Sequence, residues 1–267
     1  MITSFSNPLI KRIKQLRQKK TRQAEGVFFA EGLRVVLSAL EQNAAVELIV
    51  YAPELLKSAA ALQVVEVQKQ KGVTVIEVAA ALFQSFSDRD NPTGLGAIIQ
   101  TRLSSLEQLT ITPHSLFVLL DRVADPGNLG TILRSLDAAA AASLILIGES
   151  TDPFHPQAVK ASMGTLFSVP IVHLPTIEPV WEWAQTHNLC TIATSARASQ
   201  VYWQAPYRFP ALLLMGNEQE GLGPDVLNAA ALQVTIPMYG TATSLNLSVA
   251  TSLLLYELRR HTADTLL

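Results

Sequence analysis

The chain has 267 residues, of which 49% are hydrophobic, so it is long and apolar enough for one large domain or two smaller ones. Charged residues make up 16% and the net charge is only −2, so no overall basic field marks a nucleic-acid binder. A single cysteine excludes an internal disulfide, and five scattered histidines lack metal-ligand spacing. No apolar run approaches the ~18 residues of a membrane helix. We expect a cytoplasmic protein without a metal or a membrane partner.

The first hundred residues alternate between short apolar runs and helix-like segments. Strands are predicted over 27–30, 46–51, 73–78 and 94–101. Helices are predicted over 11–20, 32–41, 54–71 and 80–87. This alternation predicts a small α/β domain over residues 1–102. Residues 103–114 have mixed polarity and no clear period, and they are interpreted as a linker.

The alternation restarts at residue 115 and predicts a second domain over 115–267. Strands are predicted over 115–120, 143–147, 169–173, 189–194, 211–215 and 231–236. Helices are predicted over 129–142, 156–164, 178–187, 223–230 and 246–260. The almost continuous apolar character of strands such as 211–215 favours a parallel sheet that is buried on both faces.

Three segments of small and polar residues each join a predicted strand to a predicted helix. They read NLGTILRSLDA over 128–138, GNEQEGL over 216–222 and IPMYGTATSLNLSVA over 236–250. Loops of this kind expose backbone N–H groups and suit a polar ligand. An ordinary dinucleotide-binding chain places its glycine loop after the first strand, whereas the last of these segments begins about thirty residues before the C-terminus.

In this order the three segments closely resemble the signature motifs of the SpoU (TrmH-like) RNA 2′-O-ribose methyltransferases, a family of the SPOUT superfamily. The resemblance covers roughly residues 115–260. In the first domain, Phe28-Phe29-Ala30-Glu31-Gly32 and Arg34 resemble the start of the substrate-binding domain that is often fused ahead of such catalytic domains. The resemblance implies an α/β-knot domain with a deep trefoil knot, preceded by a small α/β substrate-binding domain. Knots are so rare that periodicity alone would not predict one.

The resemblance also implies an activity, a cofactor and partners. A methyl group would pass from S-adenosylmethionine to a ribose 2′-hydroxyl of structured RNA, with ribosomal RNA the first expectation and transfer RNA the second. Two alternatives stay open. One is a knotted methyltransferase that acts on a base, against which the arginine of the first motif argues. The other is a knotted RNA-binding protein without turnover, against which the presence of all motif residues argues.

Arg134 matches the catalytic arginine of the family. Considered alone, it would be a surface arginine on an Ala/Leu-rich helix. A guanidinium stays protonated near neutrality and is therefore a poor general base. We therefore expect an electrostatic role, in which Arg134 favours the developing alkoxide of the ribose and forks onto the adjacent phosphate.

Four other residues of the motifs are candidates for the active site by resemblance. They are Asn128, Glu218, Ser244 and Asn246. The asparagines and the serine also have an ordinary explanation as helix caps, and the glutamate as a carboxylate at a helix N-terminus. The resemblance places Asn128 and Glu218 in the substrate network, and Ser244 and Asn246 beside the methyl donor.

The resemblance further predicts the residues that hold the cofactor. Backbone groups of Gly216, Ile236 and Leu245 match those that hold the adenine and ribose of S-adenosylmethionine. Met215, Met238 and Asn246 complete the predicted contacts. Ile236 and Leu245 also have the character of core residues, and an apolar adenine pocket with backbone hydrogen bonds is compatible with both readings.

Two partner surfaces are expected. Residues 1–34 carry eight lysines and arginines against two glutamates, which predicts phosphate contacts by Lys11, Arg12, Arg22 and Arg34. A homodimer is expected because the family usually pairs through the knot region. The last predicted helix fits such pairing, because its apolar residues form more than one narrow stripe: Leu247, Val249, Ala250, Leu253, Leu254 and Leu258.

Overall fold

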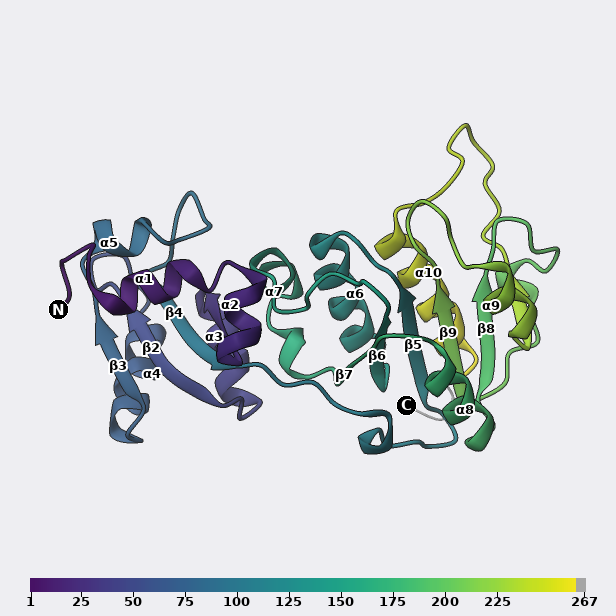
Figure 1. The fold of residues 1–267 in the computed structure, drawn as a ribbon, viewed down its shortest axis with the longest axis horizontal. Helices are drawn as coiled ribbons and strands as arrows, with labels where there is room; N and C mark the ends of the chain where they lie inside the picture. Colours follow the sequence, from purple (N-terminus) through teal and green to yellow (C-terminus); the bar gives the residue numbers. More distant parts are fainter. Residues whose placement is uncertain (263–267) are drawn as a thin grey trace. The chain divides into compact units, whose positions relative to one another are not determined.

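The computed structural model describes residues 1–262 and forms two compact units, each built around its own sheet (Figure 1). Unit 1 comprises Met1–Arg102 together with Asp152–Phe167. Unit 2 comprises Leu103–Thr151 and the chain from Ser168 onward. Helices and strands alternate in both units, so the predicted α/β class is confirmed.

Unit 1 contains a mixed four-stranded sheet in the order β1-β4-β2-β3. The strands are β1 (Val27–Glu31), β2 (Val46–Tyr51), β3 (Thr74–Glu77) and β4 (Leu95–Gln100). β2 and β3 are parallel, and β4 is antiparallel to both of its neighbours. The helices are α1 (Pro8–Gln15), α2 (Lys19–Glu25), α3 (Leu33–Glu41), α4 (Ala59–Gln70) and α5 (Ala80–Gln84). A core of Ile10, Ile13, Leu16, Phe83, Phe86 and Ile98 joins α1 and α5 to the sheet.

Two predicted helices of unit 1 have wrong boundaries. The single basic helix over 11–20 is two helices, because Gln18 adopts an extended backbone and starts a new helix at Lys19. The helix expected over 54–71 begins only at Ala59. Ser58 is its N-cap and accepts a hydrogen bond from the Ala61 N–H at 3.4 Å. Glu54 instead caps α5, since its Oε2 accepts from the Ala80 N–H at 3.0 Å.

The segment Asp152–Phe167 packs within unit 1 although it lies far along the sequence. It contains α7 (Pro156–Ser162) and the 3-10 turn η2 (Thr165–Phe167). The ring of Phe28 lies 5.0 Å from that of Phe154 and 6.2 Å from that of Phe167. The Ser38 hydroxyl donates to the Gly164 carbonyl at 2.8 Å. These contacts make the segment part of the core of unit 1.

Arg22 also anchors this segment. Its side chain is only 2% exposed. Its Nε and Nη2 donate to Asp152 Oδ2 at 2.9 and 2.6 Å, and its Nη1 donates to the carbonyls of Leu16 and Arg17 at 2.9 and 2.8 Å. The prediction that Arg22 contacts RNA is therefore wrong, because its guanidinium is buried and engaged by protein acceptors.

Unit 2 contains a six-stranded sheet in the order β10-β8-β9-β5-β6-β7. The strands are β5 (Leu116–Asp121), β6 (Ser143–Ile147), β7 (Ile171–Leu174), β8 (Cys190–Thr194), β9 (Ala211–Met215) and β10 (Leu232–Val234). All neighbours pair in parallel, as predicted. Every residue of β5 and β9 is buried, which explains their continuous apolar character. β10 ends two residues earlier than predicted.

The helices of unit 2 are α6 (Pro126–Ala138), α8 (Glu178–Thr186), α9 (Pro224–Ala229) and α10 (Leu247–Arg260), with 3-10 turns η1 (Leu106–Gln108) and η3 (Tyr202–Gln204). One core gathers around Phe117 and Trp183, whose rings are 4.9 Å apart. Elsewhere α10 packs on α6, with the hydroxyls of Ser135 and Ser252 at 2.7 Å. Throughout residues 1–262 no helix combines the length and the apolar character needed to cross a bilayer.

His155 makes the stability of unit 1 depend on pH. It is the N-cap of α7, and its Nδ1 accepts from the Gln157 N–H at 3.2 Å, which requires a neutral ring. Burial, and then the charge of Arg22, lower its pKa below the ordinary value. A lowered pKa in the folded state means that this stabilisation is present above ~6.5 and is lost as the pH falls through the folded pKa.

We expect the urea midpoint of the protein to fall between pH 7.5 and 5, with His155 contributing at most about 1 kcal/mol to the decrease. His155→Asn keeps a side-chain acceptor at the N-cap and removes the titration. Its midpoint should depend less on pH than that of the parent protein. Identical pH profiles for the two proteins would contradict this role of His155.

Candidate active site

A cleft of about 740 Å³ opens at the carboxyl ends of β8, β9 and β10. Its walls come mainly from residues 194–197, 215–222, 234–238 and 243–245, with Leu247 and Ala250 from the start of α10. Ligands of parallel α/β sheets bind at this edge, where the strands end and the loops begin. Figure 1 shows β8 and β9 side by side with the chain continuing from their ends.

Five of the predicted cofactor residues line this single cleft. They are Met215, Gly216, Ile236, Met238 and Leu245. Gly216 leaves no room for a side chain, because a Cβ there would lie 2.1 Å from the carbonyl carbon of Gly221. The loop after β9 folds back on itself at this point, since the Gly221 N–H donates to the Asn217 carbonyl at 2.9 Å.

A chain of side-chain hydrogen bonds joins all three motif segments beside the cleft. Asn128 Nδ2 donates to Glu218 Oε1 at 3.2 Å, and Asn246 Nδ2 donates to Asn128 Oδ1 at 2.9 Å. Asn246 Oδ1 in turn accepts from the N–H and the hydroxyl of Ser248 at 2.9 and 2.6 Å. The other oxygen of Glu218 accepts from the Ala124 N–H at 3.3 Å. Residues 90 and 118 positions apart are thereby held in one network.

The structure decides between capping and network roles for the polar residues. Asp125, not Asn128, is the N-cap of α6, and its Oδ1 accepts from the Asn128 N–H at 2.6 Å. The side-chain amide of Asn128 is therefore not used for capping, and it bonds to Glu218 and Asn246 instead. Asn246 does both, because it caps α10 and joins the network. Ser244 is exposed and lines the cleft without capping α10.

Arg134 lies on α6, the helix that also carries Asn128, but it does not line the cleft. Its side chain is exposed, and within residues 1–262 it has no hydrogen bond or ion pair. A guanidinium without a protein partner is free to bind an external anion. Arg134 therefore lies on the same helix as Asn128 and outside the cleft.

Sequence reasoning missed Arg122 and Asn217, which brace the loop that carries Glu218. Arg122 follows β5 with a positive φ of 50°, and its carbonyl accepts from Asn217 Nδ2 at 2.8 Å. Its guanidinium binds Asp121 at 3.1 Å and Glu220 at 3.0 Å. The pair Asp121-Arg122, at the end of the buried strand β5, is the sequence signal that marks this brace.

The sequence model of the SpoU rRNA Methylase family matches residues 115–256, which is more than half of the chain. This chain belongs to the SpoU rRNA methylase family. The MRM3-like substrate binding domain matches residues 7–97, in agreement with the resemblance of residues 28–34. All three motif segments of the network lie inside the SpoU match.

Several proteins similar to this SpoU chain cover nearly all of it. The 23S rRNA (uridine(2479)-2′-O)-methyltransferase of Streptomyces viridochromogenes is 30% identical over 90% of this chain and 84% of its own length. The 23S rRNA (guanosine(2553)-2′-O)-methyltransferase RlmP of Bacillus subtilis is 27% identical over 97% and 98%. The crystal structure of the AdoMet-bound rRNA methyltransferase from Sinorhizobium meliloti is 39% identical over 97% of each chain, with a TM-score of 0.89. The predicted α/β-knot class is confirmed by this likeness within the SpoU family.

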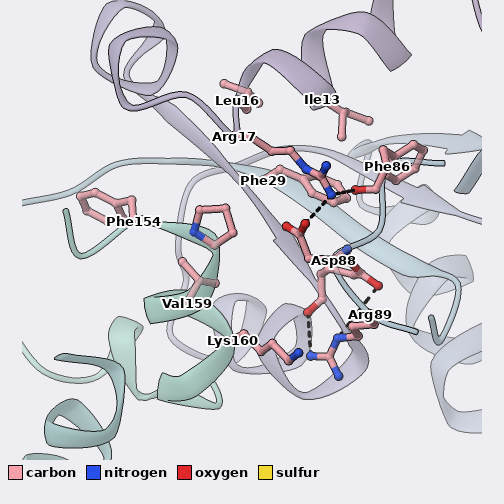
Figure 2. Close-up of a pocket in the computed structure, with 12 residues that line it drawn as sticks. Ile13, Leu16, Arg17, Phe29, Phe86, Asp88, Arg89, Phe154, Val159 and Lys160 are labelled. Carbon is pink, nitrogen blue, oxygen red and sulfur yellow. Dashed lines mark hydrogen bonds and ion pairs between the residues drawn. The ribbon is translucent and has the colours of Figure 1, made fainter. Parts of the chain in front are cut away.

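A second, much smaller cavity lies in unit 1 (Figure 2). It has a volume of about 30 Å³, enough for about one water molecule. Arg17, Arg89 and Lys160 surround it, but Arg17 is ion-paired with Asp88 and Arg89 donates to the Glu31 carbonyl at 3.3 Å. The Glu31 carboxylate accepts from the Ser87 hydroxyl at 2.6 Å. Glu31 of the substrate-domain motif thus holds the loop after α5, and this cavity is too small for a cofactor.

No group of three histidine, cysteine, aspartate or glutamate side chains that could hold a metal ion occurs within residues 1–262. Cys190 is a free, buried thiol at the start of β8, as expected for a core residue.

Proposed function

We propose that this SpoU family member transfers a methyl group from S-adenosylmethionine to a ribose 2′-hydroxyl of ribosomal RNA. The observation that carries the proposal is the network of Glu218, Asn128 and Asn246 at the rim of a ligand-sized cleft in a chain of this family. Similar proteins over nearly the full chain are ribose methyltransferases of 23S rRNA. A cytoplasmic location is part of this proposal, since a chain with a single cysteine suits a reducing compartment.

The cleft suits S-adenosylmethionine in size and in chemistry. Its 740 Å³ falls within the range of about 300–1,000 Å³ that is usual for small-ligand sites. Met215, Ile236 and Leu245 supply apolar walls for an adenine ring, and the loops supply backbone groups. The bound cofactor supplies an electrophilic methyl group. No metal ion is needed for such a transfer.

The residues around the cleft position and polarise the ribose. Asn128 is fixed between Glu218 and Asn246, so its amide stays in one orientation. We assign to Asn128 and Glu218 the alignment of the nucleotide, and to Ser244 and Asn246 contacts beside the methyl donor. Arg134 stabilises the negative charge that develops on the 2′-oxygen and binds the neighbouring phosphate. Alignment of two bound substrates supplies much of the remaining rate enhancement.

One experiment separates this function from its two alternatives. Purified protein is incubated with S-adenosylmethionine and ribosomal RNA from cells that lack the gene, and methylation is mapped at nucleotide resolution. A ribose 2′-O-methyl group blocks alkaline cleavage at one nucleotide, whereas a methylated base does not. We expect one blocked position that is already methylated in cells carrying the gene. A base modification would favour the base-directed alternative, and cofactor binding without transfer would favour a binding protein.

We further propose that unit 1 binds RNA phosphates through exposed cations. Lys11 and Arg34 are exposed, as are Lys19 and Lys20 on α2. Arg12 contributes less, because it is paired with Glu25 at 2.6 Å and with both oxygens of Glu47. Hydrogen bonds to Glu47, and then to Glu25, raise its pKa and keep its charge engaged.

Replacing Lys11, Lys19 and Lys20 together by glutamine should weaken RNA binding and flatten its dependence on salt. Each lost phosphate contact lowers the slope of log K against log salt concentration by about 0.7–0.9. The matched control replaces Lys57, Lys69 and Lys71, which are exposed in the same unit. Filter binding over a range of salt concentrations measures both slopes. Equal slopes for the two triple variants would show that the α1–α2 cations do not meet RNA.

We also propose a homodimer formed through α10. Leu247, Leu254 and Leu258 are buried within unit 2, whereas Val249, Leu253 and Tyr256 are 47%, 39% and 57% exposed. The exposed residues and Thr131 of α6 line a shallow hollow of about 380 Å³. A second copy of the same face would cover this apolar surface, and two-fold pairing is the commonest arrangement of identical chains.

Light scattering at micromolar concentration should give a mass near twice that of one 28.9 kDa chain. Leu253→Glu should shift the mass towards one chain, because the contact would bury an unpaired charge. Leu62→Glu is the control, since Leu62 is also 39% exposed but lies on α4. An active wild-type protein with the mass of a single chain would rule the dimer out.

A further inference from the structure

Arg197 is the cation of the cofactor cleft. Among the described residues that line this cleft, it carries the only positively charged side chain. It comes three residues after the end of β8, at the edge where the parallel strands end. Ser195 holds the turn, because its hydroxyl oxygen accepts from the Arg197 N–H at 3.2 Å and its carbonyl accepts from the Ala198 N–H at 3.2 Å.

The guanidinium of Arg197 has no acceptor of its own within residues 1–262. Two carboxylates also line the cleft, and both are engaged elsewhere. Glu218 accepts from Asn128 and from the Ala124 N–H. Glu220 is ion-paired with Arg122 at 3.0 Å. The exposed charge of Arg197 is therefore left for a ligand.

S-adenosylmethionine carries three charged groups: a sulfonium, an ammonium and one carboxylate. The carboxylate is its only anion, and a guanidinium binds a carboxylate through two parallel N–H···O bonds. Arg134 also has no guanidinium partner within residues 1–262, and it lies on α6 and does not line the cleft. The positions of the two arginines therefore suit two different anions. Arg197 is placed for the cofactor carboxylate inside the cleft, and Arg134 for an RNA phosphate outside it.

We infer that Arg197 binds the carboxylate of the methionine moiety of S-adenosylmethionine. This inference rests on the proposed function, because it takes the cleft to be the cofactor site. It adds a residue that determines which adenosyl compounds the cleft accepts. Adenosyl ligands without a carboxylate gain nothing from Arg197.

Isothermal titration of the full-length protein with two probes tests the assignment. One probe is S-adenosylmethionine, and the other is decarboxylated S-adenosylmethionine, which keeps the sulfonium and the ammonium but lacks the carboxylate. The variants are Arg197→Gln, Arg197→Lys and, as the matched control, Arg208→Gln. Arg208 is exposed in the same interstrand segment and does not line the cleft.

We expect Arg197→Gln to weaken S-adenosylmethionine binding about tenfold at low salt and to leave decarboxylated S-adenosylmethionine within about twofold of wild type. Arg197→Lys should retain part of the affinity, because it keeps the charge without the planar fork. Arg208→Gln should bind both probes as the wild type does.

Other outcomes overturn the assignment in distinguishable ways. Equal weakening of both probes by Arg197→Gln would mean that Arg197 acts on the adenosyl or sulfonium part. Unchanged binding of S-adenosylmethionine with weaker binding of ribosomal RNA would assign Arg197 to a phosphate. If the wild-type protein binds neither probe, the cofactor site itself is wrong and the proposed function fails with it.

Discussion

Arg134→Ala is expected to lower the turnover number by a factor of about 10²–10⁴ and to leave S-adenosylmethionine affinity unchanged. The guanidinium is exposed on α6, has no protein partner within residues 1–262 and does not line the cleft. On the proposed function, the guanidinium therefore acts on the ribose and the phosphate as charge develops, and not on the cofactor. Single-turnover methyl transfer and cofactor titration measure the two quantities separately.

Arg134→Lys should recover only a small part of the lost activity, because a point charge cannot serve the 2′-oxygen and a phosphate through one planar fork. Arg208→Ala removes another exposed arginine of unit 2 and should have no effect on turnover. If Arg134→Ala transfers methyl groups at nearly the normal rate, the catalytic assignment is wrong. If it loses cofactor affinity instead, Arg134 acts inside the cleft.

Arg22→Ala is expected to destabilise unit 1 by about 3–5 kcal/mol. The substitution leaves Asp152 as an unpaired carboxylate that is only 11% exposed. It also removes the hydrogen bonds that Arg22 donates to the carbonyls of Leu16 and Arg17 at the end of α1. An uncompensated buried charge costs much more than the loss of a surface pair.

Arg17→Ala is the matched control, because Arg17 is paired with Asp88 at the surface, with the two side chains 44% and 48% exposed. It should cost less than about 1 kcal/mol. Hydrogen exchange of the β1 amides reports on unit 1. The three tryptophans, Trp181, Trp183 and Trp203, all lie in unit 2, so their fluorescence follows the other unit. Equal losses of unfolding free energy in the two arginine variants would show that the buried Arg22–Asp152 pair stabilises unit 1 no more than the surface pair does.

The regular elements were predictable because burial imposes local periodicity. β9 is apolar at every position since both of its faces are covered, and this pattern is visible in the sequence. The break in the first helix was not predictable in this way. The basic and apolar residues continue across the break, which is held by hydrogen bonds from the buried Arg22 guanidinium to the carbonyls of Leu16 and Arg17. Local patterns carry no information about a partner 130 positions away.

The candidate site was also predictable only in part from local sequence patterns. The motif segments brought Asn128, Glu218 and Asn246 into consideration, and the structure adds that they are hydrogen-bonded to one another. The capping interpretation of Asn128 failed, because Asp125 occupies that role. The brace at Arg122 is marked in the sequence only by the adjacent pair Asp121-Arg122, because its positive φ and its contact with a loop from another strand leave no local pattern.

The two halves of this protein cannot be exchanged as contiguous pieces of gene. Phe154 and Asp152 lie inside the stretch that defines the methylase family, yet they complete a core that begins at Arg22 and Phe28. A recombination crossover near residue 102 would pair α2 and β1 with a foreign version of residues 152–167. In such a hybrid, the contacts of Arg22 and Phe28 would depend on the foreign residues at positions 152 and 154. Exchanging unit 1 as a whole therefore requires two further crossovers, one on each side of residues 152–167, so that both of its segments travel together.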